Sequence, residues 1–223
     1  INAMALGEEG ELIDPYNGQK DLELKTLRHI SPSFCEDPLR VLRVARFAAR
    51  FEHMGFKIAD ETMRLMTEMV KQGEVNHLTV ERIWQETARA LAEPSPWVYF
   101  ETLRKTTCLA VIFPEIDLLF GIPQPEKHHP EIDCGVHTLL SLKAACDLSP
   151  EPLIRFASLV HDLGKACTPK ENWPSHHNHE TLGLAPIKEL CERLRIPNAF
   201  KELSLLVCEF HTHIHRAQEL KSS

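Results

Sequence analysis

Apolar side chains recur every three to four residues along most of the chain from Asp37 onward. In the first such segment the recurring positions are Leu39, Leu42, Val44, Phe47 and Phe51. This spacing gives an α-helix one apolar face, so it predicts helices that pack on a core. Further helices are expected at 60–71, 79–92, 96–107, 136–148, 152–164, 181–195 and 199–215. Prolines lie between these segments, where the missing backbone N–H ends a helix.

Residues 1–32 have a different pattern. Turn-forming sequences flank the short apolar run Leu12–Ile13, and Leu22, Leu24 and Leu27 indicate a second short strand. Two short strands and two turns cannot bury a core alone, so this segment is either an appendage or the tail of a preceding domain. The sequence therefore predicts a mainly α protein with a helical body and a second all-α domain, divided in the Pro-rich loop 121–133.

Composition narrows the class of protein. The 223 residues are 43% hydrophobic and 26% charged, which is typical of an ordinary globular chain. No apolar run is long enough for a membrane span, and the seven cysteines form no Cys-x-x-Cys pair. We therefore expect reduced thiols, a cytoplasmic location and no membrane partner. A net charge of −7 excludes a uniformly basic coat but permits local patches that bind nucleic acid.

One predicted helix carries a stripe of arginines. Asp37 and the proline after it are typical of a helix start, and Arg40, Arg43, Arg46 and Arg50 fall within an arc of about 120°. Guanidinium groups in such a stripe repel one another unless anions or acidic partners are present, and their paired donors suit phosphates or base edges. The alternative is a solvated face whose arginines pair with acidic groups of the body.

Three motifs in this half carry a resemblance. Ile1–Ala5, Glu36–Arg40 and Leu78–Ile83 resemble motifs of class II CCA-adding tRNA nucleotidyltransferases and bacterial poly(A) polymerases. The resemblance implies that Asp37 and Arg40 select CTP or ATP by offering hydrogen-bonding edges to the base. It also implies that Arg43 and Arg46 contact the nucleotide or its phosphates, and that tRNA is the partner.

The same resemblance implies a missing part. In the family, Mg²⁺ for nucleotide addition is held by an Asp-x-Asp pair that follows a Gly-Gly-x-x-Arg segment, and the printed sequence contains neither. We therefore expect a fragment that cannot add nucleotides by itself. Residues 1–32 would be the C-terminal remnant of an α/β nucleotidyltransferase head, 33–125 the helical neck and body, and 126–223 the second domain.

The second strong signal is His161-Asp162 on an otherwise apolar segment. Burying a carboxylate requires compensation, which a divalent cation provides. His137 lies in another apolar helical run, and His211 and His215 share a helix face at i, i+4. Ligands from several helices commonly build such a site, and mixed imidazole and carboxylate donors favour Mn, Fe, Co, Ni or Mg.

Residues 159–165, Leu-x-His-Asp-Leu-Gly-Lys, resemble the HD phosphohydrolase superfamily. The resemblance implies His137, His161, Asp162 and His211 as metal ligands, with His161 and Asp162 catalytic. The metal would be Ni²⁺, Mn²⁺, Co²⁺ or Mg²⁺. In HD-bearing CCA-adding enzymes the domain implies 2′,3′-cyclic phosphodiesterase, 2′-nucleotidase and phosphatase activity.

The remaining histidines are ambiguous. His176, His177 and His179 lie in a loop, where surface exposure is the default, although their run could border the site. His213 is expected to be exposed. The superfamily usually supplies a final Asp from a later helix, and only Glu219 follows His215 as an acidic residue, so the site is expected to lack a ligand.

Three alternatives remain open at this point. A poly(A) polymerase relative would share the first two motifs but lack His161-Asp162. A nucleotide phosphohydrolase would use the first half only as a helical regulatory module. A non-catalytic RNA-binding scaffold would carry a decayed HD site. A homodimer is also left open.

Overall fold

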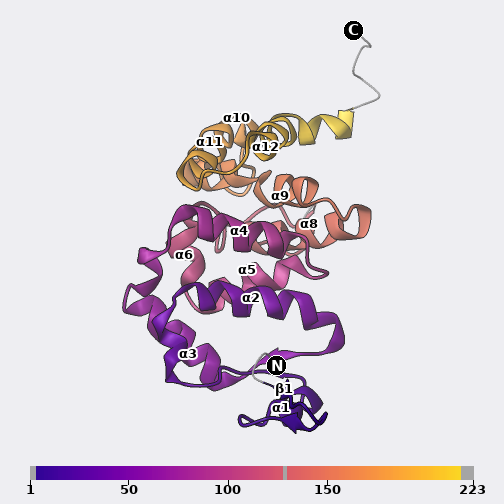
Figure 1. Ribbon diagram of the computed structural model, residues 1–223. Coiled ribbons are helices and arrows are strands. Elements are labelled where there is room, and N and C mark those ends of the chain that lie inside the picture. The colour runs from indigo at the N-terminus through magenta and orange to yellow at the C-terminus, as the bar shows by residue number, and fades with distance from the viewer. Residues whose placement is uncertain (1–3, 128–129, 217–223) are drawn as a thin grey trace. The chain divides into compact units, whose positions relative to one another are not determined.

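The computed structural model describes residues 4–127 and 130–216, without the side chains of residues 214–216, and is mainly α-helical (Figure 1). The chain forms two compact units, 1–108 and 109–223. The predicted boundary near residue 125 stays a prediction. None of the helices formed by the described residues is long and apolar enough to cross a membrane.

The first unit is built around one central helix. Helix α2 packs against α4 and α5, and its inward face supplies the fully buried Val41, Leu42 and Ala45. The helices of this unit are α1 (Gly18–Glu23), α2 (Leu39–Phe51), α3 (Asp60–Lys71), α4 (Val80–Leu91) and α5 (Pro96–Lys105). The period of apolar positions thus predicted the three long helices after α2 to within two residues at each end.

Short strands hold the N-terminal segment to this unit. Strand β1 (Ala5–Leu6) pairs antiparallel with β2 (Leu12–Ile13), and β3 (Thr26–Leu27) pairs in parallel with β4 (Lys57–Ile58). The predicted strand at Leu12–Ile13 is confirmed. The second strand, expected from Leu22, Leu24 and Leu27, forms only at Leu27, in β3. Around Leu22 the expectation was wrong, because Asp14 accepts the N–H groups of Gly18 and Gln19 at the start of a short helix.

The second unit is all-helical among its described residues. Helix α9 is its centre and packs against α8 and α12, while α10 and α11 close one side. Its helices are α6 (Cys108–Ile112), which begins at the unit boundary, α7 (Pro114–Asp117), α8 (Cys134–Leu148), α9 (Pro152–Val160), α10 (His179–Leu182), α11 (Leu184–Arg193) and α12 (Asn198–Phe210). A 3₁₀ turn, η4 (Leu163–Cys167), follows α9 and packs against α10.

Candidate metal centre and nucleotide pocket

In the second unit one buried carboxylate is surrounded by histidines. Asp162 follows the end of α9 and is 1% exposed. The Nε2 atoms of His137 and His161 lie 3.6 and 3.2 Å from its Oδ2 atom. The Nε2 atoms of His179 and His211 lie 3.3 and 3.4 Å from its Oδ1 atom. Rings from α8, from α10 and from the residues that follow α9 and α12 therefore converge on a single side chain.

Each of these rings is oriented by a hydrogen bond at Nδ1. Because the partner is a backbone carbonyl or a carboxylate, which accept, Nδ1 carries the proton in each neutral ring. The partners are the Ser158 carbonyl for His161 at 2.7 Å, the His176 carbonyl for His179 at 2.9 Å, the Cys208 carbonyl for His211 at 2.9 Å and the Glu131 carboxylate for His137 at 2.6 Å. Each Nε2 atom consequently faces Asp162, and it offers a lone pair when the ring is neutral and a proton when the ring is charged. The Nε2 atoms of His179 and His211 also lie 3.2 Å apart.

This arrangement has more acceptors than donors. Among the described residues no hydrogen bond reaches Asp162 Oδ1, although the atom is buried and two histidine nitrogens are within 3.4 Å. A buried acceptor without a donor costs free energy, and a divalent cation would remove that cost. Two overlapping sets, His137–His161–Asp162 and Asp162–His179–His211, have ligand atoms within 4.8 Å of one another. The donor set therefore fits one or two divalent cations.

Two loop residues, Gln124 and Glu131, are linked to the cluster through Lys165 and His137. Lys165 is buried, and its Nζ atom lies 2.7 Å from Asp162 Oδ2 and 2.8 Å from Gln124 Oε1. Gln124 in turn donates from Nε2 to Glu131 Oε1 at 3.1 Å, the same oxygen that orients His137. No local sequence pattern marks Gln124 or Glu131, because both lie in the Pro-rich loop before α8.

The environment sets the charge of the cluster. Burial by itself would raise the pKa of Asp162, but the neighbouring histidines, His161 foremost, hold that pKa well below its usual range. Burial lowers the pKa of His137. Burial also acts to lower the pKa of His211, but Asp162 outweighs it and the pKa of His211 is raised. At neutral pH Asp162 is thus ionised and the ring of His137 is neutral.

Not all of the loop histidines are exposed, although exposure was expected for residues in a loop. His177 is exposed as expected, but His176 is 1% exposed and donates from Nε2 to the Pro123 carbonyl at 2.7 Å. His179 begins α10 and belongs to the cluster, where Gly164 permits the close approach because a Cβ there would collide with the His179 carbonyl oxygen. His213 is half-buried, not exposed. The side chain of His215 and Glu219 lie outside the described residues.

In the first unit the arginines of the stripe differ in burial and in their acidic partners. Arg46 is 8% exposed, and its guanidinium lies 2.8 Å from Glu86 Oε2 and 3.3 Å from Glu93 Oε1. Arg50 meets the second Glu93 oxygen at 2.9 Å, whereas Arg43 is exposed. The body thus supplies the acidic partners that one alternative required, and the burial of Arg46 favours a structural role over contact with a nucleotide.

Asp37 and Arg40 lie at the start of the same helix. Asp37 Oδ1 accepts the N–H of Leu39 at 3.1 Å, although Pro38, and not Asp37 as predicted, occupies the cap position of the helix. The carboxylate also pairs with Arg82 Nη2 at 3.0 Å, so two of the sequence motifs meet there. Arg40 donates to the Ser33 carbonyl. Two oxygens with these partners retain acceptor capacity, and base reading by Asp37 stays a prediction.

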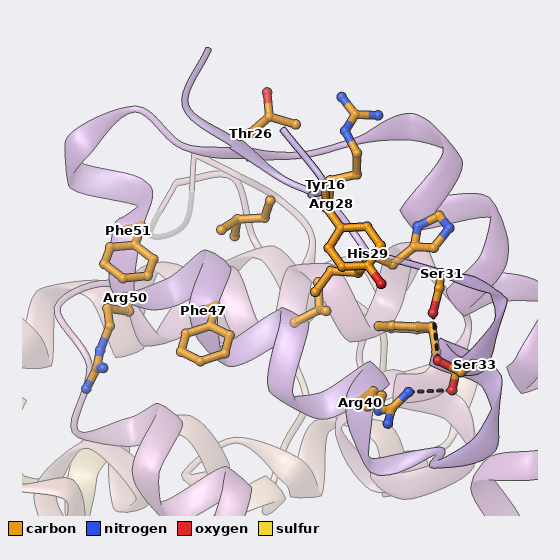
Figure 2. Close-up of a pocket in the computed structure, with 14 residues that line it drawn as sticks. Tyr16, Thr26, Arg28, His29, Ser31, Ser33, Arg40, Phe47, Arg50 and Phe51 are labelled. Atoms are coloured by element: carbon orange, nitrogen blue, oxygen red, sulfur yellow. Dashed lines mark hydrogen bonds between the residues drawn. The ribbon is translucent and has the colours of Figure 1, made fainter. Parts of the chain in front are cut away.

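Arg40 also lines a cavity of about 570 Å³ in the first unit (Figure 2). Phe47, Phe51 and Arg50 reach it from α2, and Tyr16 and Arg28 reach it from the N-terminal segment. Aromatic faces suit stacked bases, and guanidinium groups suit phosphates. No sequence pattern predicted this cavity, because its walls come from segments that the fold brings together.

Comparison with known proteins agrees with this geometry. The family "Probable RNA and SrmB- binding site of polymerase A" matches residues 55–119, and the HD domain family matches residues 135–222. The solved structure described as a complex of CCA-adding enzyme with CTP is 23% identical, with a TM-score of 0.61, over 98% of this chain and 47% of that one. A Thermotoga maritima CCA-adding enzyme complexed with tRNA is 19% identical, with a TM-score of 0.57, over 100% of this chain and 60% of that one. At these identities the structures show a shared fold.

Closer relatives are found among curated sequences. The Multifunctional CCA protein of Teredinibacter turnerae is 58% identical over 222 residues, which are 100% of this chain and 54% of the relative. The protein of the same name from Haemophilus influenzae is 57% identical over 228 residues, 100% of this chain and 55% of the relative. The chain spans about half the length of the curated relatives it matches. Over its whole length this chain is therefore similar to about half of each of these multifunctional CCA proteins.

Proposed function

We propose that this chain is the nucleotide-selecting and hydrolytic part of an enzyme that builds and repairs the 3′-terminal CCA of tRNA. The whole protein would use CTP and ATP without a nucleic-acid template and trim damaged ends with its HD domain. The single observation that carries the hydrolytic half is the convergence of four histidine Nε2 atoms on Asp162. Similarity to the multifunctional CCA proteins supports the transferase half.

In the hydrolytic site His137, His161, Asp162 and His211 would hold the metal ion, together with His179. A bound divalent cation would activate water and polarise a phosphoryl oxygen, which is the chemistry of metal-dependent phosphohydrolases. Ni²⁺, Mn²⁺, Co²⁺ and Mg²⁺ are the candidates. The substrates would be 2′,3′-cyclic phosphodiesters, 2′-nucleotides and related phosphomonoesters.

The chain's own residues prepare this site. The carbonyl and carboxylate partners at Nδ1 fix the rings so that each Nε2 faces inward, which also makes the nitrogen more basic. Lys165 holds one oxygen of Asp162 and leaves the other without a donor among the described residues. The burial of Asp162 keeps bulk water from competing for that oxygen.

The test is hydrolysis of 2′,3′-cyclic AMP by the full-length protein and by its double variant His161→Ala, Asp162→Ala. We expect the double variant to lose the activity and the bound metal together. The matched control is Asp147→Asn, on the exposed face of α8. Full phosphodiesterase activity in the double variant would reject the assignment of the site.

In the first unit we propose that Asp37 and Arg40 read the base and that Arg43 contacts the nucleotide or its phosphates. The aromatic cavity beside Arg40 supports a nucleotide ligand. Mg²⁺ would serve nucleotide addition, tRNA would be the RNA partner, and the cytoplasm would be the location; a homodimer stays a prediction.

This half is tested by Asp37→Ala in the full-length protein, with Asp60→Ala, at an exposed aspartate that begins α3, as control. The expected result is loss of discrimination between CTP, ATP and the other nucleotides, with the control unchanged. Because Asp37 also pairs with Arg82, the unfolding free energy of both variants is measured alongside. Intact selectivity in Asp37→Ala would remove the base-reading role.

A further inference from the structure

A second cavity, of about 340 Å³, lies beside the histidine cluster in the second unit. Helix α9 and the residue after it contribute Ile154, Ser158 and His161, and α12 contributes Leu203 and Val207. His161 is shared, because it lines the cavity while its Nε2 atom lies 3.2 Å from Asp162 Oδ2. A molecule held in the cavity would therefore reach the cluster directly.

The lining of this cavity excludes some ligands. Its described lining carries no Asp, Glu, Lys or Arg, so a phosphate would find no countercharge there. Leu203, Val207 and Ile154 present aliphatic surface that can cover the face of a flat ring. Cavities of about 300–1,000 Å³ are the usual size for small-molecule sites.

Two serines line the cavity, and the hydroxyl of one of them contacts the cluster. Ser141 lines it from α8, and its Oγ atom lies 3.3 Å from His137 Nε2. Ser158 lines it one turn before His161. Serine hydroxyls both donate and accept, so they suit the hydroxyls of a sugar placed between the apolar wall and the cluster.

We propose that this cavity holds the ribose and base of the terminal nucleoside whose phosphate lies at the histidine cluster. The inference rests on the proposed hydrolytic function and adds its specificity. Because the lining offers hydroxyls but no amide or charged group to a base edge, the site selects for a nucleoside with little preference among bases. Hydrolysis would then act on damaged ends whichever nucleotide is terminal.

The experiment fills the cavity by enlarging two half-buried side chains that line it. Val207→Phe and Leu203→Phe are made in the full-length, metal-loaded protein, and Leu206→Phe, 55% exposed on the same helix, is the matched control. Hydrolysis of 2′,3′-cyclic AMP and 2′,3′-cyclic CMP is compared with that of glycerol 2-phosphate, which has no base. Metal content and thermal unfolding are measured for each variant.

For the two filling variants we expect KM for both cyclic nucleotides to rise roughly tenfold to a hundredfold, with kcat largely kept. Turnover of glycerol 2-phosphate and metal content should stay close to wild type, and Leu206→Phe should change nothing. The wild type should use the two cyclic nucleotides within about fivefold of each other, well under the roughly tenfold or greater preference that a pocket contact can impose. An equal rise for all three substrates, or none, would overturn the proposal.

Product binding separates this inference from the function on which it rests. Calorimetry with adenosine 3′-monophosphate reports on the cavity without turnover. Loss of binding in Val207→Phe with retention in Leu206→Phe supports the cavity even for a protein that hydrolyses nothing, a result that would reject the hydrolytic function alone. Unchanged binding in both filling variants overturns the inference and leaves the hydrolytic function standing.

Discussion

In the first unit the buried carboxylates of Glu86 and Glu93 have a guanidinium at each of their four oxygens, supplied by Arg46, Arg50 and Arg89. In the second unit the buried carboxylate of Asp162 has Lys165 at one oxygen, and no described donor reaches the other. All three carboxylates are buried, with exposed fractions of 3% for Glu86, 7% for Glu93 and 1% for Asp162.

The difference separates a structural ion cluster from a candidate cation site. Where arginines satisfy every carboxylate oxygen, the ionic network is complete and has no place for another charge. At Asp162, imidazole nitrogens and a carboxylate oxygen face one another. A bound cation would stabilise this excess of acceptor atoms. The sequence indicated an anion-binding site at the arginine stripe. One arginine of that stripe, Arg46, instead stabilises the fold.

The largest effect is expected from a substitution that breaks the ionic cluster of Arg46, Glu86 and Glu93. Arg46→Leu leaves two buried glutamates without their shared partner, so the free energy of unfolding of the first unit should fall by about 3–5 kcal/mol. Arg50→Leu removes a half-exposed partner and should cost no more than about 1 kcal/mol. Urea unfolding followed by Trp84 and Trp97 fluorescence, in a Trp173→Phe background, measures both. Equal costs would show that burial does not distinguish the two arginines.

The next effect is confined to the second unit. A divalent ion at a hundred times its Kd should stabilise that unit by about 2.7 kcal/mol, because it binds the folded cluster. Hydrogen exchange followed by mass spectrometry should show added protection in α9 and α12 and none in α2. Equal protection of α2 would mean that the ion acts on the whole chain and not at Asp162.

A smaller effect concerns the orientation of one ligand. Glu131→Gln weakens the hydrogen bond that orients His137, so metal affinity should fall about 10- to 100-fold. The control is Glu126→Gln, an exposed residue of the same loop. Titration with Mn²⁺ followed by electron paramagnetic resonance measures the affinities. An unchanged affinity would remove Glu131 from the site.

A feature of this protein is predictable from sequence when the residues that form it lie close together along the chain. The helices predicted at 60–71 and 96–107 form at 60–71 and 96–105, because their apolar period is local. The resemblance to known motifs located His161, Asp162 and His137. Gln124 reaches Lys165 across 41 positions, so no local pattern could reveal the contact. His176 and His179 were expected to be exposed because they lie in a loop. They are not exposed, because the fold packs this loop against the site.

The smallest expected effect uses His176, which is buried but is not among the candidate ligands. Burial lowers the pKa of His176, so the unfolded chain binds its proton more readily than the folded chain does. Stability of the metal-free second unit should therefore fall as pH drops below about 6.5, and part of that loss belongs to His176.

His176→Gln keeps a donor for the Pro123 carbonyl but cannot titrate. Its deficit in unfolding free energy relative to the wild type should shrink between pH 7 and pH 5. Denaturation with a chelator present measures both proteins. A deficit that is constant with pH would show that His176 does not titrate on unfolding.

The most direct test of the contrast between the two clusters is calorimetric titration of the chelator-treated protein with Mn²⁺ or Ni²⁺, for the wild type, Asp162→Asn and Arg50→Leu. We predict binding of one or two ions per chain in the wild type and in Arg50→Leu, and loss of that binding in Asp162→Asn. Binding that survives in Asp162→Asn would contradict the account.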